Sequence, residues 1–518
     1  MMFDREVVIG SRRLVIRLNG NPMQSAGENH FFGYPLHPQL SSISATNIGS
    51  FINNIKGYFV FVGLERDRMV IANDITGGFR LYTCVVGGTT YFSNDHDYLI
   101  RLMGENGLLR RDDNEYRYWC RHGYTTGGAT YIAGLNKVEP ASLIEATASG
   151  INATCYFKDI ANEPDAGKHT ELCLRELDSV VREATAPDKE VVLFFSGGVD
   201  STLLALLLRV SKRVFYPVFM KARPFYRDNY ESYLRAEANA SYLGLHLHEI
   251  EIDIESNDGT LAAIARAMPF DRHPARLHFG ALDQIQKRYG SDIIILSGQG
   301  ADNVLSFGPS GRTKGDFAAR ALIYHAYGVL AKAAAKAVGR ALRGRFRAPV
   351  SEIEYLTAFF DPQQYYAVLD DADPASYRQY IEAAVMRLAA SLKSKPALLM
   401  YLKTFTYLQG ADNQVVYASA RKAGIERINL PYTSPEFIYR TIRYKDQGRE
   451  FLHPKYFVRQ SIRALGANLP EPHRPRKRPA FVQLGELIKQ SDRHFYHEAR
   501  RLAAMDGRWM AATDDSRT

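Results

Sequence analysis

The chain has 518 residues, of which 46% are hydrophobic and 23% charged, and its formal net charge is +9. This composition is ordinary for a globular protein of two or three domains, and 39 Gly and 22 Pro exclude collagen-like and low-complexity classes. No apolar run reaches the roughly 18 residues of a transmembrane helix, and the acidic start lacks the features of a signal peptide. We therefore expect a cytoplasmic protein with no transmembrane segment.

The cysteines and the excess of positive charge also exclude functions. Cys84, Cys120, Cys155 and Cys173 are too far apart for a C-x-x-C zinc or redox site. The positive charge suits an acidic partner without requiring one, and no RNP-like or OB-fold pattern accompanies the many aromatic residues. The sequence therefore predicts no nucleic-acid partner.

Residues 1–165 have the pattern of a β-rich domain. Short β-branched and aromatic runs alternate with Gly, Asn and Asp at turn spacing, which predicts strands joined by hairpins. The expected strands cover residues 7–9, 14–18, 57–62, 69–72, 79–83, 90–93, 130–132 and 142–145. Residues 158–169 are rich in Asp, Asn, Glu, Pro and Gly, which indicates a linker.

The pattern changes in residues 171–518 to that of an α/β domain. Strands that are apolar on both faces alternate with helices, which predicts a doubly wound parallel sheet. The expected strands are residues 190–195, 214–220, 246–254 and 292–296, with helices at 201–208 and 231–243. Beyond about residue 316 we expect mostly helix, with a polar interruption near 467–480.

The strongest chemical signal follows the first of these strands, where residues 196–202 read S-G-G-V-D-S-T. The two glycines let the backbone turn tightly and present N–H groups to an anion at a helix N-terminus. The hydroxyls of Ser196, Ser201 and Thr202 add donors. Because Asp200 would repel a bare phosphate, its presence predicts a divalent cation between carboxylate and phosphate.

This string resembles the pyrophosphate-binding loop of the N-type ATP pyrophosphatases, which cleave ATP to AMP and pyrophosphate. A second segment, S-G-Q-G-A-D-N-V-L at residues 297–305, resembles the S-G-E-G-A-D-E-L-F segment of asparagine synthetases. The resemblance implies ATP and Mg²⁺ as cofactors, with Asp200 and Asp302 on the metal. The implied nucleotide-binding residues are Phe194 and Phe219 (by strand position, through their backbone), Ser196, Gly197, Gly198, Asp200, Ser201, Thr202 and Gly298.

The chain resembles the asparagine synthetase superfamily over nearly its full length, because residues 71–78 and 91–95 look like hairpins of its glutaminase domain. That domain is a sandwich of the N-terminal-nucleophile type, and it uses an N-terminal Cys as the nucleophile. Here Met2 stands at that position. We therefore predict an inactive glutaminase-like domain in residues 1–165 and an ATP-dependent synthetase or cyclase domain in residues 171–518.

The synthetase half also departs from asparagine synthetases, since Gln299 replaces a Glu and cannot act as a general base. β-Lactam synthetases and lasso-peptide cyclases share both departures. The Pro-containing turn that follows, with Asp316 before a helix, looks most like the lasso cyclases. That resemblance implies closure of a macrolactam ring between the N-terminal amine of a core peptide and an Asp or Glu side chain. It also implies a precursor peptide, a leader peptidase and a precursor-recognition protein as partners, in the biosynthesis of an antibiotic or bacteriocin.

Residues 474–481, R-P-R-K-R-P-A-F, resemble the family's R-x-K-x-x-F loop, whose Lys stabilises charge on the adenylate. Lys477 fits that role, whereas anchoring the pattern on Phe481 selects Arg478. Both are candidate catalytic residues, as is Gln299, whose role is either catalytic or spatial. Lys455 begins a segment that resembles the family's K-x-x-x-R pattern, without an assigned role.

Other functions stay open. A β-lactam-synthetase-like or other small-molecule amide ligase shares every residue named above. An asparagine synthetase using ammonia, an adenylating tRNA-modifying enzyme and a non-catalytic nucleotide-binding scaffold fit less well. Outside the motifs, residues 271–273 (D-R-H) are expected to form a surface loop.

Overall fold

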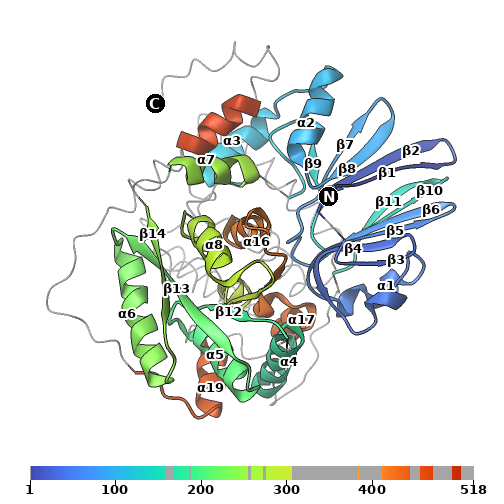
Figure 1. The fold of residues 1–518 in the computed structure, drawn as a ribbon. Coiled ribbons are helices and arrows are strands. Elements are labelled where there is room, and N and C mark those ends of the chain that lie inside the picture. The colour runs from blue at the N-terminus through green and yellow to red at the C-terminus, as the bar shows by residue number, and fades with distance from the viewer. Residues whose placement is uncertain are drawn as a thin grey trace, which may run out of the picture.

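The structure is a computed structural model, and it forms three β-sheets with surrounding helices (Figure 1). None of the helices that it describes is long and apolar enough to cross a membrane. It describes residues 2–20, 22–125, 127–157, 169–185, 188–254, 258–271, 276–305, 383, 411–443, 455–470 and 493–502.

The N-terminal part builds two of the sheets, and every strand pair in them is antiparallel except β2 with β8. The first sheet has the order β1 (Met2–Ile9), β2 (Arg12–Asn19), β8 (Thr89–Ser93), β7 (Tyr82–Val86), β9 (Asn136–Lys137). The second has the order β11 (Gly150–Cys155), β10 (Ser142–Thr147), β6 (Arg68–Asn73), β5 (Lys56–Glu65), β4 (Asn29–Leu36), β3 (Gln24–Ala26).

The two sheets form a layered arrangement because β2 turns alternate side chains inward, whereas β5 and β6 are buried on both faces. In β2, Leu14, Ile16 and Leu18 are buried in one apolar cluster with Val60 and Val62 of β5. Helix α2 (His96–Glu105) packs on β7 and β8, and α1 (Ile48–Phe51) joins a separate apolar cluster on β5 and β6. That this sandwich is of the N-terminal-nucleophile type remains a prediction.

The strand predictions for this part are mostly confirmed. The strand expected at 130–132 is wrong, because the segment makes only an isolated bridge, between Ile132 and Arg111. Tyr131 is nevertheless fully buried. The strand expected at 79–83 begins only at Tyr82. The sequence reading missed β3, β4, β9 and β11.

The third sheet is parallel throughout, as predicted. Its strand order is β14 (His248–Asp253), β13 (Phe215–Arg223), β12 (Val191–Phe194), β15 (Ile294–Ser297), β16 (Arg427–Asn429). The chain runs outward from β12 through β13 to β14, and then returns to the other side of β12. The carboxyl ends of β12 and β15 therefore flank the switch point where doubly wound sheets bind ligands.

Helices cover both faces of this sheet, which confirms the doubly wound arrangement. In β12, Val192 and Phe194 face one apolar cluster while Leu193 faces another. The first cluster includes residues of α7 (Asp258–Ala267), α8 (Arg276–Tyr289) and α16 (Ala411–Lys422). The second includes residues of α4 (His169–Ala184), α5 (Val199–Val210), α6 (Arg227–Tyr242), α17 (Pro435–Arg443) and α19 (Tyr456–Ala464).

The N-terminal sandwich and the parallel sheet share buried surface. Tyr58 of β5 packs on Tyr417 of α16 with ring centroids 4.5 Å apart and ring planes tilted by 36°, and its hydroxyl donates to the Glu426 carbonyl at 2.8 Å. The Gln414 amide donates to the Gly77 carbonyl at 2.9 Å. One apolar cluster runs through both parts. The linker and the domain limits at 165 and 171 stay predictions, because residues 158–168 lie outside the described ranges.

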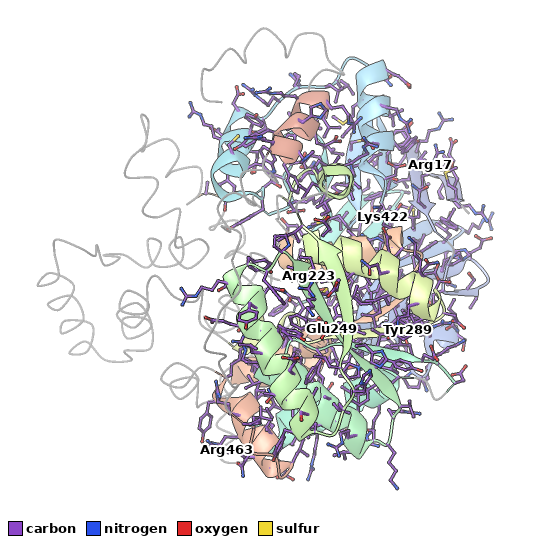
Figure 2. All side chains as sticks on the ribbon, turned by 60° about the vertical axis from the view of Figure 1, so that its left-hand side comes forward. Arg17, Arg223, Glu249, Tyr289, Lys422 and Arg463 are labelled. Atoms are coloured by element: carbon purple, nitrogen blue, oxygen red, sulfur yellow. The ribbon has the colours of Figure 1, made fainter. Side chains whose placement is uncertain are left out.

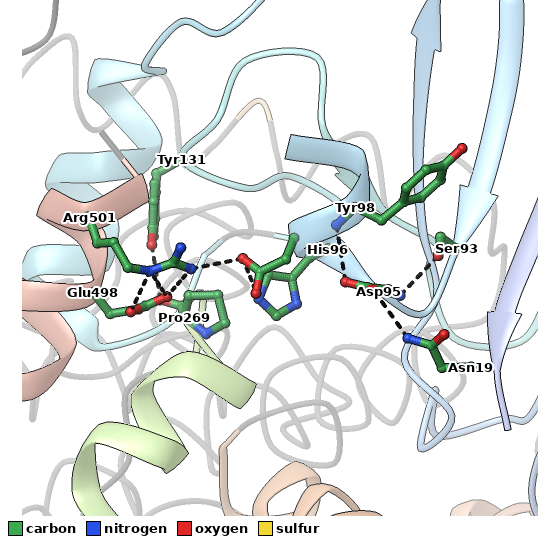
Figure 3. A network of polar contacts seen from close by, with 10 residues as sticks. Asn19, Ser93, Asp95, His96, Tyr98, Tyr131, Pro269, Glu498 and Arg501 are labelled. Atoms are coloured by element: carbon green, nitrogen blue, oxygen red, sulfur yellow. Dashed lines mark hydrogen bonds and ion pairs between the residues drawn. The ribbon is translucent and has the colours of Figure 1, made fainter. Parts of the chain in front are cut away.

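A helix at residues 493–502 ties the C-terminal part to the N-terminal part (Figure 3). Arg501 donates to Glu498 at 2.6 Å and to Asp97 of α2 at 2.8 Å. The Tyr496 ring lies 5.4 Å from Trp119 of α3 (Asp113–His122).

The prediction of a surface loop at 271–273 is wrong for Asp271, which is 4% exposed; residues 272–273 lie outside the described ranges. Its carboxylate accepts from Arg80 at 2.9 Å and lies 3.9 Å from the Lys137 ammonium. Burial lowers the pKa of Lys137 to about 8 despite the nearby Asp271. A short segment with three polar residues looks exposed in sequence, but here two basic side chains from the sandwich enclose its first residue.

Candidate functional site

The S-G-G-V-D-S-T segment forms the turn between β12 and α5, as predicted. Gly197 has φ +67°, and a Cβ there would lie 2.2 Å from the Ala236 backbone nitrogen, so only glycine fits. The Asn239 side chain donates to the Gly197 carbonyl at 2.7 Å. Helix α6 therefore fixes the shape of this turn from behind.

Two of the three predicted hydroxyls line the turn. The Ser196 hydroxyl lies 3.3 Å from that of Ser201, which donates to the Gly198 carbonyl at 3.1 Å. The Gly198 N–H points to Ser196 Oγ at 3.3 Å. Thr202 is fully buried, and its hydroxyl has no hydrogen-bond partner among the described residues, so its predicted role in ligand binding remains a prediction.

The second motif comes to the same place from β15. A Cβ on Gly298 would lie 3.2 Å from the Asp200 Cβ, so this glycine allows the two turns to approach closely. The Gln299 N–H donates to Ser297 Oγ at 3.2 Å, and Asp302 lies in the first turn of α9 (Ala301–Leu305). The sequence thus correctly placed both motifs at adjacent strand ends.

One lysine joins the two predicted metal ligands. The Lys455 ammonium lies 2.6 Å from Asp200 Oδ2 and 2.7 Å from Asp302 Oδ1. The side chain of Asp200 is 18% exposed, whereas that of Asp302 is 75% exposed. Burial raises the pKa of Asp200, which the charge of Lys455 partly offsets and Asp302 reinforces.

The residues present fit a divalent cation. Asp200 Oδ1 is buried and has no hydrogen-bond partner in the described part of the chain, so it is free to coordinate. Among the described residues, no group of three or more His, Cys, Asp and Glu side chains is arranged to hold a metal ion by itself. Mg²⁺ is typically held by one or two carboxylates together with substrate phosphates, so Asp200 and Asp302 suffice with a nucleotide present.

A charged cluster lies on the neighbouring strands, and the sequence reading missed it. Lys221 pairs with Glu249 and lies 3.5 Å from Glu251, whose carboxylate also accepts from Arg223 at 2.5 Å. The Lys221 ammonium lies 4.6 Å from the Tyr233 ring centroid. Arg223 and Glu249 are labelled in Figure 2 on β13 and β14.

The predicted adenine-binding positions lie between this cluster and the turn. Phe194 ends β12 and pairs with Val218, so the next residue of β13, Phe219, stands level with the start of the turn. Both rings are buried. The buried rings are therefore not presented to a base at this edge, and the backbone role of these residues remains a prediction.

The other predicted catalytic side chains cannot be placed. Lys477 and Arg478 lie outside the described residues, as do the motif positions Phe481 and Asp316. Their roles remain predictions, as does that of Gln299, which is half-buried beside the second turn.

Two residues at the site had no role assigned from sequence. Lys455 was matched to a family pattern, but its contact with Asp200 spans 255 positions, which local spacing does not reveal. The Tyr432 hydroxyl donates to the Asp200 carbonyl at 3.0 Å, and this Tyr is completely buried. The signal for it was the resemblance of residues 428–432 (I-N-L-P-Y) to the family's R-x-P-F/Y-L segment, to which no role was assigned.

Comparison with known proteins supports the assignment of this part of the chain. The family model described as asparagine synthase matches residues 173–426, which supports the asparagine synthetase superfamily and ATP-dependent amide ligation in general. No curated protein matches this chain.

Solved structures give weak similarities. One is the glutamine phosphoribosylpyrophosphate amidotransferase from B. subtilis complexed with ADP and GMP, at 10% identity and TM-score 0.16, covering 51% of this chain and 52% of that one. Another is titled as the allosteric regulatory enzyme of purine biosynthesis, at 14% identity and TM-score 0.12, covering 35% of each chain. This chain thus spans about half and about a third of their lengths, and scores this low carry no argument about fold or function.

Proposed function

We propose that this chain is an ATP-dependent carbon–nitrogen ligase that forms AMP and pyrophosphate. The observation that carries the proposal is the convergence of Asp200 and Asp302 beside a glycine-rich turn, where two parallel strands end at the switch point. The asparagine synthase match over residues 173–426 adds to it. A carboxylate does not react with an amine at neutral pH, so activation by ATP supplies the leaving group.

In the proposed reaction, a substrate carboxylate oxygen attacks the α-phosphorus of ATP and pyrophosphate leaves. The amine nitrogen then attacks the acyl carbon, AMP leaves, and a base takes the proton from nitrogen. The N–H of Gly198 and the hydroxyls of Ser196 and Ser201 bind the pyrophosphate portion. Mg²⁺ held by Asp200 and Asp302 neutralises phosphate charge when it is bound. Lys477 or Arg478 stabilises the charge that develops on the acyl-adenylate.

The substrate that we propose is a core peptide whose N-terminal amine closes a macrolactam ring on its own Asp or Glu side chain. Met2 at the position of the glutaminase nucleophile supports a reaction that does not use glutamine, and Gln299 supports a departure from asparagine synthesis. In such a ring closure the enzyme acts mainly by holding the two ends of one peptide together. The peptide would reach this enzyme from a leader peptidase and a precursor-recognition protein.

A β-lactam-synthetase-like or other small-molecule ligase is the second candidate, because the same site residues serve both reactions. ATP–pyrophosphate exchange with a leaderless core peptide, aspartate and a carboxyethyl amino acid distinguishes them. Exchange driven by the peptide, with loss of one water from its mass, supports the cyclase. Exchange with a small acid alone moves the assignment to a small-molecule ligase, and exchange with aspartate and ammonia alone to an asparagine synthetase.

The variant Asp200→Ala tests whether exchange depends on this site. Asp67→Ala is the matched control, since Asp67 is exposed in the turn between β5 and β6. We expect exchange to be lost in the first variant and kept in the second. If Asp200→Ala keeps the same ATP–pyrophosphate exchange as Asp67→Ala and wild type, the proposed function is contradicted.

A further inference from the structure

Lys455 neutralises the two carboxylates that the proposed function assigns to a cation. Its ammonium contacts Asp200 Oδ2 and Asp302 Oδ1 at 2.6 and 2.7 Å, so one positive charge bridges both side chains. Asp200 is largely buried, and a buried carboxylate without a counter-charge is strongly unfavourable. In the absence of metal and nucleotide, Lys455 therefore supplies the charge that the site needs.

The backbone places this lysine firmly. Lys455 directly precedes α19 with φ 66° and ψ 30°, a left-handed conformation that is unfavourable for a residue with a side chain. Helix α19 packs on α5, and Phe457, Val458 and Ile462 anchor it in the core. The residue itself is only 9% exposed. The helix thus delivers the ammonium to the start of α5, while the four-carbon stem lets its end move.

An ammonium and a divalent cation compete for these oxygens. Both need to be within contact distance of Asp200 Oδ2 and Asp302 Oδ1, where their mutual repulsion is strong. A metal ion alone offers the displaced ammonium no new partner, whereas a phosphate chain offers it several oxygens.

We propose that Lys455 is a resident counter-ion that holds the cation site closed, so that a divalent cation displaces it only when pyrophosphate or a triphosphate is present. This inference rests on the proposed function for its assignment of Asp200 and Asp302 as cation ligands. Lys455 thereby determines the order in which ligands bind. The divalent cation and the phosphate chain bind together, and the cation does not occupy the site without the phosphate chain.

The test measures Mn²⁺ binding without nucleotide, by electron paramagnetic resonance of the free ion, in wild type, Lys455→Met and Lys455→Gln. We expect both variants to bind Mn²⁺ about tenfold more tightly than wild type, since a charge in direct contact with the ligands is gone. Adding Asp200→Asn to either variant is expected to remove the gain. Lys212→Met is the matched control, because Lys212 has the same left-handed backbone, with φ 53°, and is exposed.

Equal Mn²⁺ affinity in wild type and in either folded variant overturns the proposal. Wild type alone gives a second test, through its midpoint of thermal unfolding with Mn²⁺, with pyrophosphate, and with both. We expect a clear rise only with both together, and a full rise with Mn²⁺ alone overturns the proposal without any variant.

The outcome also separates this inference from the proposed function. Tighter Mn²⁺ binding in the Lys455 variants without any ATP–pyrophosphate exchange in wild type supports the counter-ion and contradicts the ligase. Exchange in wild type with unchanged Mn²⁺ affinity in the variants supports the ligase and overturns the counter-ion.

Discussion

Asp74 and Asp200 occupy similar places in the two halves of the molecule. Each lies beyond a buried strand, β6 or β12, in a segment with two adjacent glycines. The Asp74 carboxylate accepts from the N–H groups of Phe59, Thr76, Gly78 and Phe79 at 2.9–3.2 Å and from the Thr76 hydroxyl at 2.5 Å. Asp200 has one oxygen on Lys455 and the other without a hydrogen-bond partner among the described residues.

The difference separates a carboxylate used for structure from one kept available for a ligand. The protein has turned every nearby donor toward Asp74, so this side chain organises the loop that contacts α16. Around Asp200 the carboxylate has its own backbone N–H and the Lys455 ammonium as partners, and its Oδ1 has no hydrogen-bond partner within the described part of the chain. A buried acid whose hydrogen bonds are incomplete is thus the better indicator of function.

The largest expected effect is on activity. Asp200→Asn is expected to lower ATP–pyrophosphate exchange by at least about 10³-fold, since the neutral amide does not neutralise phosphate charge through a cation. The midpoint of thermal unfolding in EDTA is expected to stay close to that of wild type, because Lys455 keeps Asp302 as a partner. A large loss of stability with retained exchange would instead give Asp200 a structural role, like that of Asp74.

Asp74→Ala is expected to act on stability and to reverse this pattern. It leaves five hydrogen-bond donors without their acceptor in a buried loop, at about 1–3 kcal/mol for each donor that finds no other partner. Denaturant unfolding should therefore show a loss of more than about 4 kcal/mol. Asp67→Ala, in an exposed turn, should change the free energy of unfolding by less than about 0.5 kcal/mol. A similar small change in both variants would contradict the structural role of Asp74.

Lys137→Met tests a buried charge where the two halves meet. The quantity to follow is how the stability difference between the variant and wild type depends on pH. The pKa of Lys137 falls from 10.5 in the unfolded chain to about 8 in the folded protein, so both states are protonated below pH 8 and the buried ammonium is fully destabilising there. Between pH 8 and 10.5 the folded state releases the proton first, and the penalty fades. The variant should thus be more stable than wild type by about 2 kcal/mol at pH 7, with a smaller gain at pH 9.5. Thermal unfolding across this range measures it, and a gain that grows with pH contradicts the prediction.

The smallest expected effect comes from restoring the missing nucleophile. Met2→Cys, with Met1 removed, should release no glutamate from glutamine above background. Met2 is 46% exposed on the edge strand β1, and the adjacent Phe3 packs on Phe32 with ring centroids 5.3 Å apart. A glutaminase assay measures this, and glutamate release in the variant would show that the sandwich still forms a substrate pocket.

The sequence predicted those features that depend on local pattern. Continuous apolar runs revealed β12, β13, β14 and β15, and the two glycine-containing motifs placed Asp200 and Asp302 at neighbouring strand ends. The strand β16 was missed because its three residues are too few for a pattern, and because β15, its strand partner among the described residues, precedes it by more than a hundred residues.

What the sequence did not reveal depends on contacts between distant segments. Lys455 reaches Asp200 across 255 positions, and Asp271 is enclosed by Arg80, which lies 191 positions before it. Tyr131 resembles a strand residue because it is aromatic and flanked by the β-branched Thr130 and Ile132, but packing against Phe270 and Trp119 holds it in irregular backbone. Burial by tertiary packing has no local signature, so these residues became identifiable only in three dimensions.

The packing of Tyr58 against Tyr417 has a consequence for how this chain can be shortened. One apolar cluster continues from the sandwich into α16 and β12. Removing residues 2–157 would therefore remove the side chains that cover Tyr417, Ile428 and their neighbours, and would expose them to water. A truncated version would aggregate even with every nucleotide-site residue intact. The sandwich thus completes the apolar core of the parallel-sheet part, and the two parts are best kept together in any shortened version.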